Sequence, residues 1–281
     1  MEKLQAALEK AREKRGETGG ALRPSKARRS KDPGLVASEL NALWENIPEM
    51  TVNKTRLQKR KLVFMEAGRL ATPFDMLRTK VLQIAAANGW KRVAVTSPSP
   101  GCGKTTTAVN LALSLGRQPD LRVMLFDMDM RRPALAKTLM QKGMTNSTHD
   151  VLDRKVTLEQ QAMRIGSNLI ISANASPMRD PSELFLRQRT GDIIDELEST
   201  YKPDLIVFDM PPMLINDDTS AFLRHVDCAL IVVEAGASTV EQVDLCEKEL
   251  AVQTNVLGMA LNKCRFQSDG YGYYSNYGAK Y

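Results

Sequence analysis

The stretch VAVTSPSPGCGKTTT, residues 93–107, has the residue types of a phosphate-binding loop. A β-branched apolar run leads into a Pro/Gly-rich turn, and a helix-forming stretch follows at once. Backbone N–H groups of such a turn and the positive end of the helix dipole converge on an anion. Lys104 would reach the terminal phosphates of a nucleotide, and the Thr105 hydroxyl would bind Mg²⁺. The full pattern G-x-x-x-x-G-K-[ST] requires a glycine where this chain has Pro98, so an ordinary Gly-rich turn is the alternative interpretation.

Carboxylates end two further apolar runs of the chain. Asp127 and Asp129 lie in VMLFDMDMRRP, and Asp209 lies in LIVFDMPP. Residues i and i+2 of a strand point to the same side, so Asp127 and Asp129 could both face bound phosphates. Like charges at the end of a buried strand need a compensating cation, and Mg²⁺ would supply it. Asp209 has the place of an acid that holds Mg²⁺ through a water. Strand-end acids without a function are the alternative.

A parallel sheet would bring these side chains together. Short Val/Ile/Leu-rich runs alternate with helix-forming stretches. We predict strands at 92–96, 122–127, 168–172, 204–209, 228–234 and 256–261, and helices at 73–88, 104–117, 181–200, 218–225, 238–252 and from Pro133. The alternation predicts an α/β fold, a mostly parallel P-loop NTPase-like sheet with helices on both faces. Ligands of such sheets bind beyond the carboxyl ends of the strands, where each motif falls.

Composition divides the chain into three parts. Residues 1–60 are predicted to form a basic, largely disordered arm with short helices, 61–264 the sheet domain, and 265–281 a flexible tail. Residues 1–34 hold ten Lys/Arg and five Asp/Glu, so most of the net charge of +6 lies in the arm. The nearly neutral remainder argues against binding of nucleic acid. The arm could contact an acidic partner or an anionic membrane, or simply be a solvated segment.

Several classes of protein are excluded by what the sequence lacks. No run approaches the roughly 18 apolar residues of a membrane span, and the N-terminus has no signal-peptide pattern. We therefore expect a cytoplasmic protein. The four cysteines form no C-x-x-C pair, so neither disulfides nor a structural zinc site is expected.

The C-terminus concentrates the tyrosines. Five of the six lie in the last eleven residues, and they are Tyr271, Tyr273, Tyr274, Tyr277 and Tyr281. Glycine and polar residues between them exclude a packed core, so the phenols should be exposed. A low-complexity, adhesive tail is the alternative.

Together these features resemble the bacterial tyrosine kinases, the cytoplasmic autokinases of capsule and exopolysaccharide synthesis. The shared motifs are S-x-x-P-G-x-G-K-T, D-x-D-x-R and D-x-P-P, in that order, and the resemblance covers roughly residues 72–281. It implies a protein-tyrosine kinase that uses ATP and Mg²⁺ to phosphorylate its own tyrosine cluster.

The resemblance also implies roles for individual residues. Asp127 is the candidate base, with the assignment between Asp127 and Asp129 left open, and Lys104 would stabilise the transferring phosphoryl group. Asp129 and Asp209 would serve Mg²⁺ with Thr105. Arg131 would contact phosphate or an acidic partner, and Asn262 the adenine. The expected nucleotide contacts within the loop are Pro100, Gly101, Cys102, Gly103, Lys104, Thr105 and Thr106.

The family implies partners as well: a membrane polysaccharide copolymerase-type activator that recruits the kinase to the inner face of the membrane, further copies of the kinase domain, and a phosphotyrosine phosphatase. Family members form rings through an E-x-x-R-x-x-R motif, and this chain has Thr72, Asp75 and Arg78 at those places. Ring formation is therefore an open question.

Two other functions share this fold. A partition or division-site ATPase would carry a signature lysine where this chain has Ser99, and it would not need a tyrosine-rich tail. A non-catalytic, nucleotide-gated coupling subunit of a polysaccharide export complex would not need Lys104 and the three aspartates.

Overall fold

The computed structural model describes residues 33–51, 57, 60, 62, 71–141 and 143–264, and only the backbone of 33–37. The chain divides into two units, Met1–Ser38 and Glu39–Tyr281, and the sheet and the site lie in the second. The predicted arm before residue 33 and the tyrosine tail, 265–281, lie outside the described residues. No helix in the described ranges is long and apolar enough to cross a membrane.

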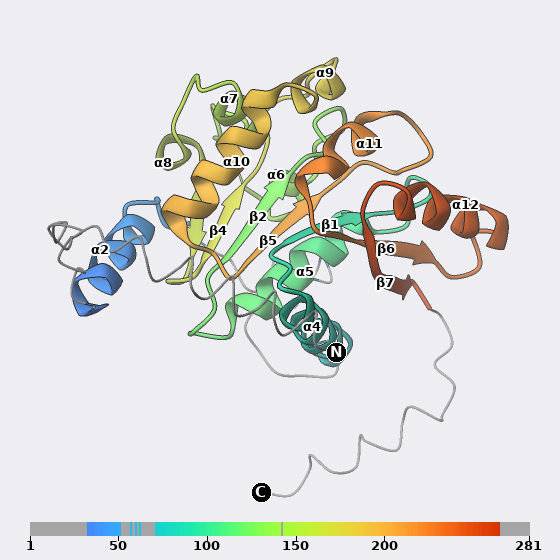
Figure 1. Ribbon diagram of the computed structural model, residues 1–281, viewed down its shortest axis with the longest axis horizontal. Helices are drawn as coiled ribbons and strands as arrows, with labels where there is room; N and C mark the ends of the chain where they lie inside the picture. Colours follow the sequence, from blue (N-terminus) through green and yellow to red (C-terminus); the bar gives the residue numbers. More distant parts are fainter. Residues whose placement is uncertain are drawn as a thin grey trace, which may run out of the picture. The chain divides into compact units, whose positions relative to one another are not determined.

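A seven-stranded sheet with the order β3-β4-β2-β5-β1-β6-β7 forms the framework (Figure 1). All neighbouring strands are parallel except β3 and β4, which are antiparallel. The predicted mostly parallel fold is therefore confirmed. The strands are β1 (Arg92–Thr96), β2 (Val123–Asp127), β3 (Met163–Ile165), β4 (Leu169–Ser172), β5 (Leu205–Asp209), β6 (Cys228–Glu234) and β7 (Asn255–Asn262).

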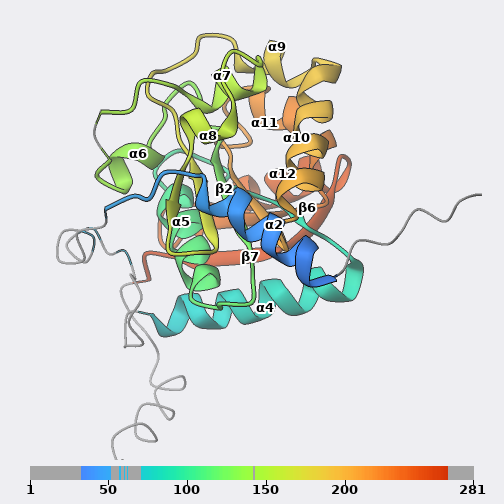
Figure 2. The same ribbon diagram turned by 90° about the vertical axis from the view of Figure 1, so that its left-hand side faces the viewer.

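Helices cover both faces of the sheet, with α4 and α5 on one side and α10 on the other (Figures 1 and 2). The described helices are α2 (Pro33–Glu45), α4 (Thr72–Asn88), α5 (Lys104–Gly116), α6 (Leu135–Thr138), α7 (Thr148–Leu152), α8 (Leu158–Gln161), α9 (Pro181–Phe185), α10 (Gln188–Tyr201), α11 (Asp218–Phe222), the 3₁₀ turn η1 (Leu223–His225) and α12 (Val240–Ala251).

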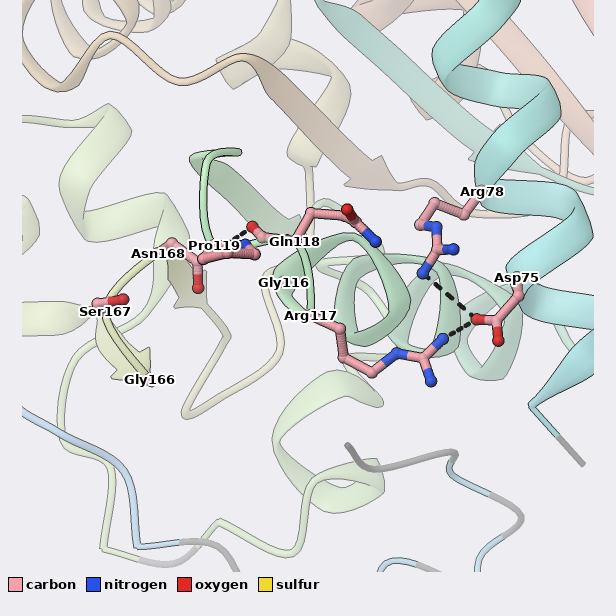
Figure 3. Close-up of a pocket in the computed structure, with 9 residues that line it drawn as sticks. All are labelled: Asp75, Arg78, Gly116, Arg117, Gln118, Pro119, Gly166, Ser167 and Asn168. Atoms are coloured by element: carbon pink, nitrogen blue, oxygen red, sulfur yellow. Dashed lines mark hydrogen bonds and ion pairs between the residues drawn. The ribbon is translucent and has the colours of Figure 1, made fainter. Parts of the chain in front are cut away.

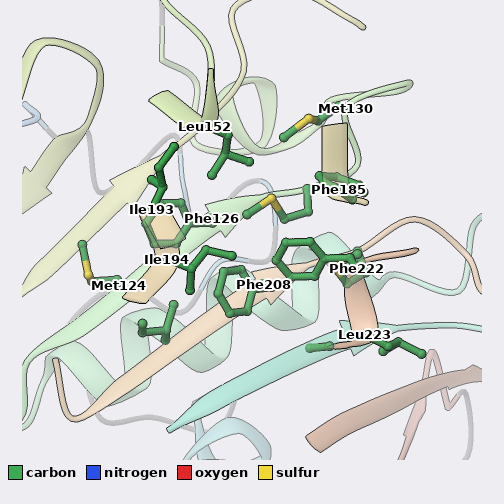
Figure 4. Packing of buried hydrophobic residues seen from close by; sticks show 14 of the residues in the cluster. Met124, Phe126, Met130, Leu152, Phe185, Ile193, Ile194, Phe208, Phe222 and Leu223 are labelled. Atoms are coloured by element: carbon green, nitrogen blue, oxygen red, sulfur yellow. The ribbon is translucent and has the colours of Figure 1, made fainter. Parts of the chain in front are cut away.

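The central strands are apolar on both sides because each side has its own core. Met124 and Phe126 of β2 face one cluster, whereas Val123 and Leu125 face the other. Figure 4 shows the first cluster, in which the rings of Phe126 and Phe208 stack with centroids 5.7 Å apart. Continuous apolar strands of this kind hold the strand ends in fixed register, which positions the motif residues.

The end of α2 belongs to the first core. Trp44 and Ile47 are fully buried, and the indole N–H of Trp44 donates to the Tyr201 carbonyl at 2.8 Å. The structure thus has a helix, α2, within the arm predicted over 1–60, and its Leu40 and Trp44 side chains belong to the core on this face of the sheet. The start of the sheet domain at residue 61 stays a prediction.

Three local predictions differ from the structure. The helix predicted over 181–200 is two helices, because Arg187 between them has extended backbone and the Thr190 hydroxyl donates to the Leu184 carbonyl at 2.6 Å. The helix predicted from Pro133 begins at Leu135 and has only four residues. The short edge strand β3 was not predicted.

Candidate functional site

The phosphate-binding loop joins β1 to α5 (Figure 1). Gly101 and Gly103 have φ of 87° and 91°, in the region that favours glycine. A Cβ on Gly103 would lie 2.2 Å from the side-chain nitrogen of Asn262. Pro100 and Gly101 are exposed, and Thr105 and Thr106 are half-buried at the start of α5. The loop therefore closes tightly against the sheet and leaves the N-terminal end of α5 available to an anion.

Asn262 and Cys102 hold the loop in this shape. The Asn262 side-chain amide donates to the Cys102 carbonyl at 2.8 Å, which links the loop to the end of β7. The Cys102 thiol, itself buried, donates to the Ser99 carbonyl at 3.2 Å. The contact that Asn262 makes is thus with the loop backbone, and its role as an adenine contact stays a prediction.

The acidic motifs meet the loop at the carboxyl ends of β2 and β5. Asp127 and Asp209 are directly paired residues of these neighbouring strands. The Lys104 ammonium lies 2.6 Å from an Asp129 carboxylate oxygen and 3.9 Å from one of Asp209. Lys104, Asp127, Asp129 and Asp209 are all buried. The structure thus brings these four side chains together at one edge of the sheet, and the roles assigned to them stay predictions.

Two of these carboxylates lack ordinary partners. One oxygen of Asp127 accepts from the Leu135 N–H at 3.2 Å, and its other oxygen, like both oxygens of Asp209, is buried without a hydrogen bond of normal geometry. The Thr105 side chain nevertheless lies near enough to Asp209 to lower its pKa. Buried oxygens without partners are rare in stable folds, so these oxygens suit a bound cation or donor.

Burial and the neighbouring charges shift the pKa values of Lys104, Asp127 and Asp209. Burial, with repulsion from Asp209, raises the pKa of Asp127 well above its usual range. Burial also raises the pKa of Asp209 to about 6, although Lys104 opposes this rise. Burial disfavours the charged form of Lys104, but attraction to Asp209 and Asp129 outweighs it and raises the pKa of the ammonium. When all three carboxyls are ionised, these four side chains carry a net charge of −2, which one divalent cation would neutralise.

The donor set suits Mg²⁺. No group of three or more His, Cys, Asp or Glu side chains in the described residues could hold a metal alone. Mg²⁺ keeps several waters and binds through one or two carboxylates plus phosphate oxygens, so it does not require such a group. The unpartnered Asp209 oxygens beside the Thr105 hydroxyl fit that mode.

Arg131 is held away from the centre of the site. Its guanidinium donates to both oxygens of Asp218, at 2.6 and 3.0 Å, and to the Arg179 carbonyl. Asp218, at the start of α11, is 1% exposed. Of the two alternatives in the sequence, the structure shows Arg131 with an acidic partner. Sequence reasoning missed Asp218 because it is 87 residues away and no local pattern marks the pairing.

Comparison with known proteins places the chain among kinases. An AAA domain matches residues 90–255, more than half of the chain. Tyrosine-protein kinase YwqD of Bacillus subtilis (strain 168) is 27% identical over 224 residues, which are 78% of this chain and 93% of that protein. Putative tyrosine-protein kinase EpsB of Ralstonia solanacearum is 32% identical over 205 residues, 72% of this chain but only 27% of that protein.

A solved structure agrees with these relatives. The VpsO kinase domain superposes with a TM-score of 0.58 and 25% identity, covering 67% of this chain and 97% of that one. These comparisons confirm the expected resemblance to bacterial tyrosine kinases and the expected enzyme class. The chain belongs to the AAA domain family, and within it to the group of the bacterial tyrosine kinases.

Proposed function

We propose that the chain uses ATP and Mg²⁺ to phosphorylate its own C-terminal tyrosines, and that this reaction regulates synthesis and export of an exopolysaccharide or capsule. The observation that carries the proposal is the meeting of Lys104 with Asp127, Asp129 and Asp209 beneath a glycine loop. The tyrosine cluster, Tyr271–Tyr281, supplies the acceptors.

Binding of ATP would change the partner of Lys104. The ammonium now lies on the Asp129 carboxylate. The terminal phosphates of ATP would take the place of that carboxylate, since they are stronger anions at the positive end of α5. Asp129 would then be released to face the metal shell with Asp209 and Thr105. Mg²⁺ would neutralise charge developing on the phosphate oxygens.

Asp127 is the base in this proposal. A tyrosine hydroxyl has a pKa of about 10 and enters the site neutral, so its proton must be accepted as the phosphoryl group arrives. Burial raises the pKa of Asp127, which makes its ionised form a stronger base than an exposed carboxylate. The oxygen of Asp127 that has no partner is free to accept the proton.

Arg131 would act on the site indirectly. Its bonds to Asp218 and to the Arg179 carbonyl tie the segment after β2 to the start of α11 and to the loop before α9. Contact between Arg131 and phosphate would require those bonds to break, so we propose a positioning role. Adenine binding near Asn262 and contacts with Pro100, Gly101 and Thr106 belong to the same proposal.

The proposed partners are those that the family resemblance implies. A membrane polysaccharide copolymerase would dock on the kinase, activate it and recruit it to the inner face of the cell membrane. A phosphotyrosine phosphatase would reset the tail, and other copies of the kinase domain could exchange tails with it.

Two substitutions test the assignment of roles. Lys104→Met should weaken both binding of a fluorescent ATP analogue and transfer of labelled phosphate to the chain. Asp127→Asn should retain binding and lower transfer by about 10²–10⁴-fold, as loss of a general base does. Equal transfer by Asp127→Asn and the unmodified chain would refute its role as the base. ATP hydrolysis without labelled protein in the unmodified chain would favour a positioning ATPase, and binding alone would favour a coupling subunit.

A further inference from the structure

A solvent-open hollow of about 590 Å³ lies at the other end of α5 from the phosphate-binding loop. Asp75 and Arg78 of α4, Arg117 and Gln118 after α5, and Ser167 and Asn168 between β3 and β4 are among its lining residues (Figure 3). The proposed phosphotransfer does not use this hollow. Its volume is within the range of small-ligand sites.

Two arginines in the hollow share one acid. Figure 3 shows the guanidinium groups of Arg78 and Arg117 both pointing at the Asp75 carboxylate. The Arg78 contact is 3.5 Å long, and Arg117 contacts the same oxygen of Asp75. The Ser114 hydroxyl donates to that oxygen at 2.7 Å. The cluster therefore has one more positive than negative charge and already presents its cations to an anionic group.

The two guanidinium groups also have donors to spare. With the residues that the structure describes, Arg78 forms hydrogen bonds through Nη1, which donates to the Ser114 carbonyl at 3.1 Å. Arg117 uses Nη2, and its Nε is buried without a hydrogen-bond partner. A guanidinium carries five N–H donors, so a second anion could be bound without breaking the contacts to Asp75.

Capping of α5 explains only half of this arrangement. Arg78 satisfies the carbonyl of Ser114 in the last turn of α5, which is a structural task. The hydrogen bond and ion pair of Arg117 go instead to the Ser114 hydroxyl and to Asp75. The Nε of Arg117 is buried without a hydrogen-bond partner, so neither capping nor the ion pair with Asp75 accounts for the placement of this guanidinium beside the hollow.

We propose that this hollow binds the phosphoryl group of a phosphotyrosine from the kinase tail, through Arg78 and Arg117. A phosphotyrosine carries a charge of about −1.5 to −2 and three acceptor oxygens, which match the surplus cation and the spare N–H groups. Arginine clusters are a common means of recognising such groups. The choice of ligand rests on the proposed function, because the chain itself would then produce phosphotyrosine beside its own fold.

The phosphotyrosine could come from the tail of the same chain or from that of a second copy. Seventeen residues follow Cys264, and fully extended they span at most about 55–60 Å. The donor is thus the tail of the same chain or of a second copy. Docking at this end of α5 would keep a phosphorylated tail away from Lys104 at the other end, so a finished product would not occupy the catalytic site.

A synthetic peptide test separates this proposal from the kinase activity. The full chain is dephosphorylated and titrated, without nucleotide, into a fluorescent peptide of residues 270–281 phosphorylated at Tyr277, with anisotropy as the readout. The unphosphorylated peptide and inorganic phosphate are the parallel ligands. Arg117→Gln should weaken binding of the phosphopeptide about tenfold or more, as loss of charged hydrogen bonds implies. Asp75→Asn should strengthen it about fivefold by removing a like charge.

Arg154→Gln is the matched control, since Arg154 forms an exposed ion pair with Glu196 outside the hollow. It should leave the affinity unchanged. Misfolding would not make Asp75→Asn bind more tightly. The Asp75→Asn result therefore tests the proposal even if the Arg117→Gln variant is unstable. Absence of binding, equal affinity for both peptides, or equal weakening by Arg154→Gln would each overturn the proposal. Competition by phosphate alone, with no added affinity from the peptide, would show a free-phosphate site and would also overturn it. None of these results bears on whether the chain phosphorylates itself.

Discussion

Asp209→Asn should stabilise the protein when nucleotide and Mg²⁺ are absent. Both carboxylate oxygens of Asp209 are buried without a normal hydrogen bond, and burial raises the pKa of this carboxyl from 3.8 to about 6. A shift of about two units corresponds to roughly 3 kcal/mol that the ionised group costs the folded state. Asparagine removes the charge and keeps the shape, so the free energy of unfolding should rise by that order.

The pH dependence of this effect has a definite sign. In the unfolded chain the Asp209 carboxyl loses its proton near pH 3.8, whereas in the fold it keeps the proton up to about pH 6. The penalty is therefore absent below pH 3.8, grows between the two values, and is complete above pH 6. The stability gained by Asp209→Asn should follow the same curve, being largest at pH 7–8 and vanishing in acid.

Thermal unfolding with EDTA at pH 8 and at pH 4 measures this gain. About 3 kcal/mol corresponds to a rise in Tm of roughly 6–12 °C for a domain of this size. Asp218→Asn is the control, because Asp218 is equally buried but bonded twice to Arg131, and its loss should lower the Tm. A fall in Tm for Asp209→Asn at pH 8 would refute the reasoning, since it would show that the carboxylate is satisfied in the fold.

Three further predictions each concern a single residue. Gly103→Ala should weaken binding of a fluorescent ATP analogue at least tenfold, because its Cβ would meet the Asn262 side chain at 2.2 Å and its φ would be strained by about 1–3 kcal/mol. Burial lowers the pKa of His225, so its neutral ring favours the fold above pH 6.5 and stability is lost below it. The Tm of His225→Gln should therefore fall less between pH 7 and pH 5. Trp44→Phe leaves the Tyr201 carbonyl without its donor and should lower the free energy of denaturant unfolding by about 1–3 kcal/mol.

Local sequence patterns were sufficient to predict the strands that end in a motif residue. The strand that leads into the loop before Lys104, and the strands that carry Asp127 and Asp209, were predicted within one residue, because buried parallel strands leave continuous apolar runs bounded by turn residues. Parallel packing then places the ends of such strands at one edge, so the meeting of the motifs could also be predicted.

Long-range contacts could not be read from the sequence. The pairing of Arg131 with Asp218 and the contact of Asn262 with the loop join segments far apart in the chain. The break at Arg187 depends on the Thr190 hydroxyl, which binds a carbonyl that an unbroken helix would have used otherwise. The amphipathic pattern continues through that break, so periodicity alone predicts one helix.

Mass spectrometry of the tail tests the central claim most directly. The full chain is incubated with Mg²⁺ and ATP, with and without a cytoplasmic peptide of a membrane copolymerase, and the C-terminal peptides are then mapped. We predict phosphate on tyrosines within Tyr271–Tyr281 that is absent from a parallel Lys104→Met sample. Unmodified tyrosines in the active sample, with ATP bound or hydrolysed, would contradict the proposed autokinase.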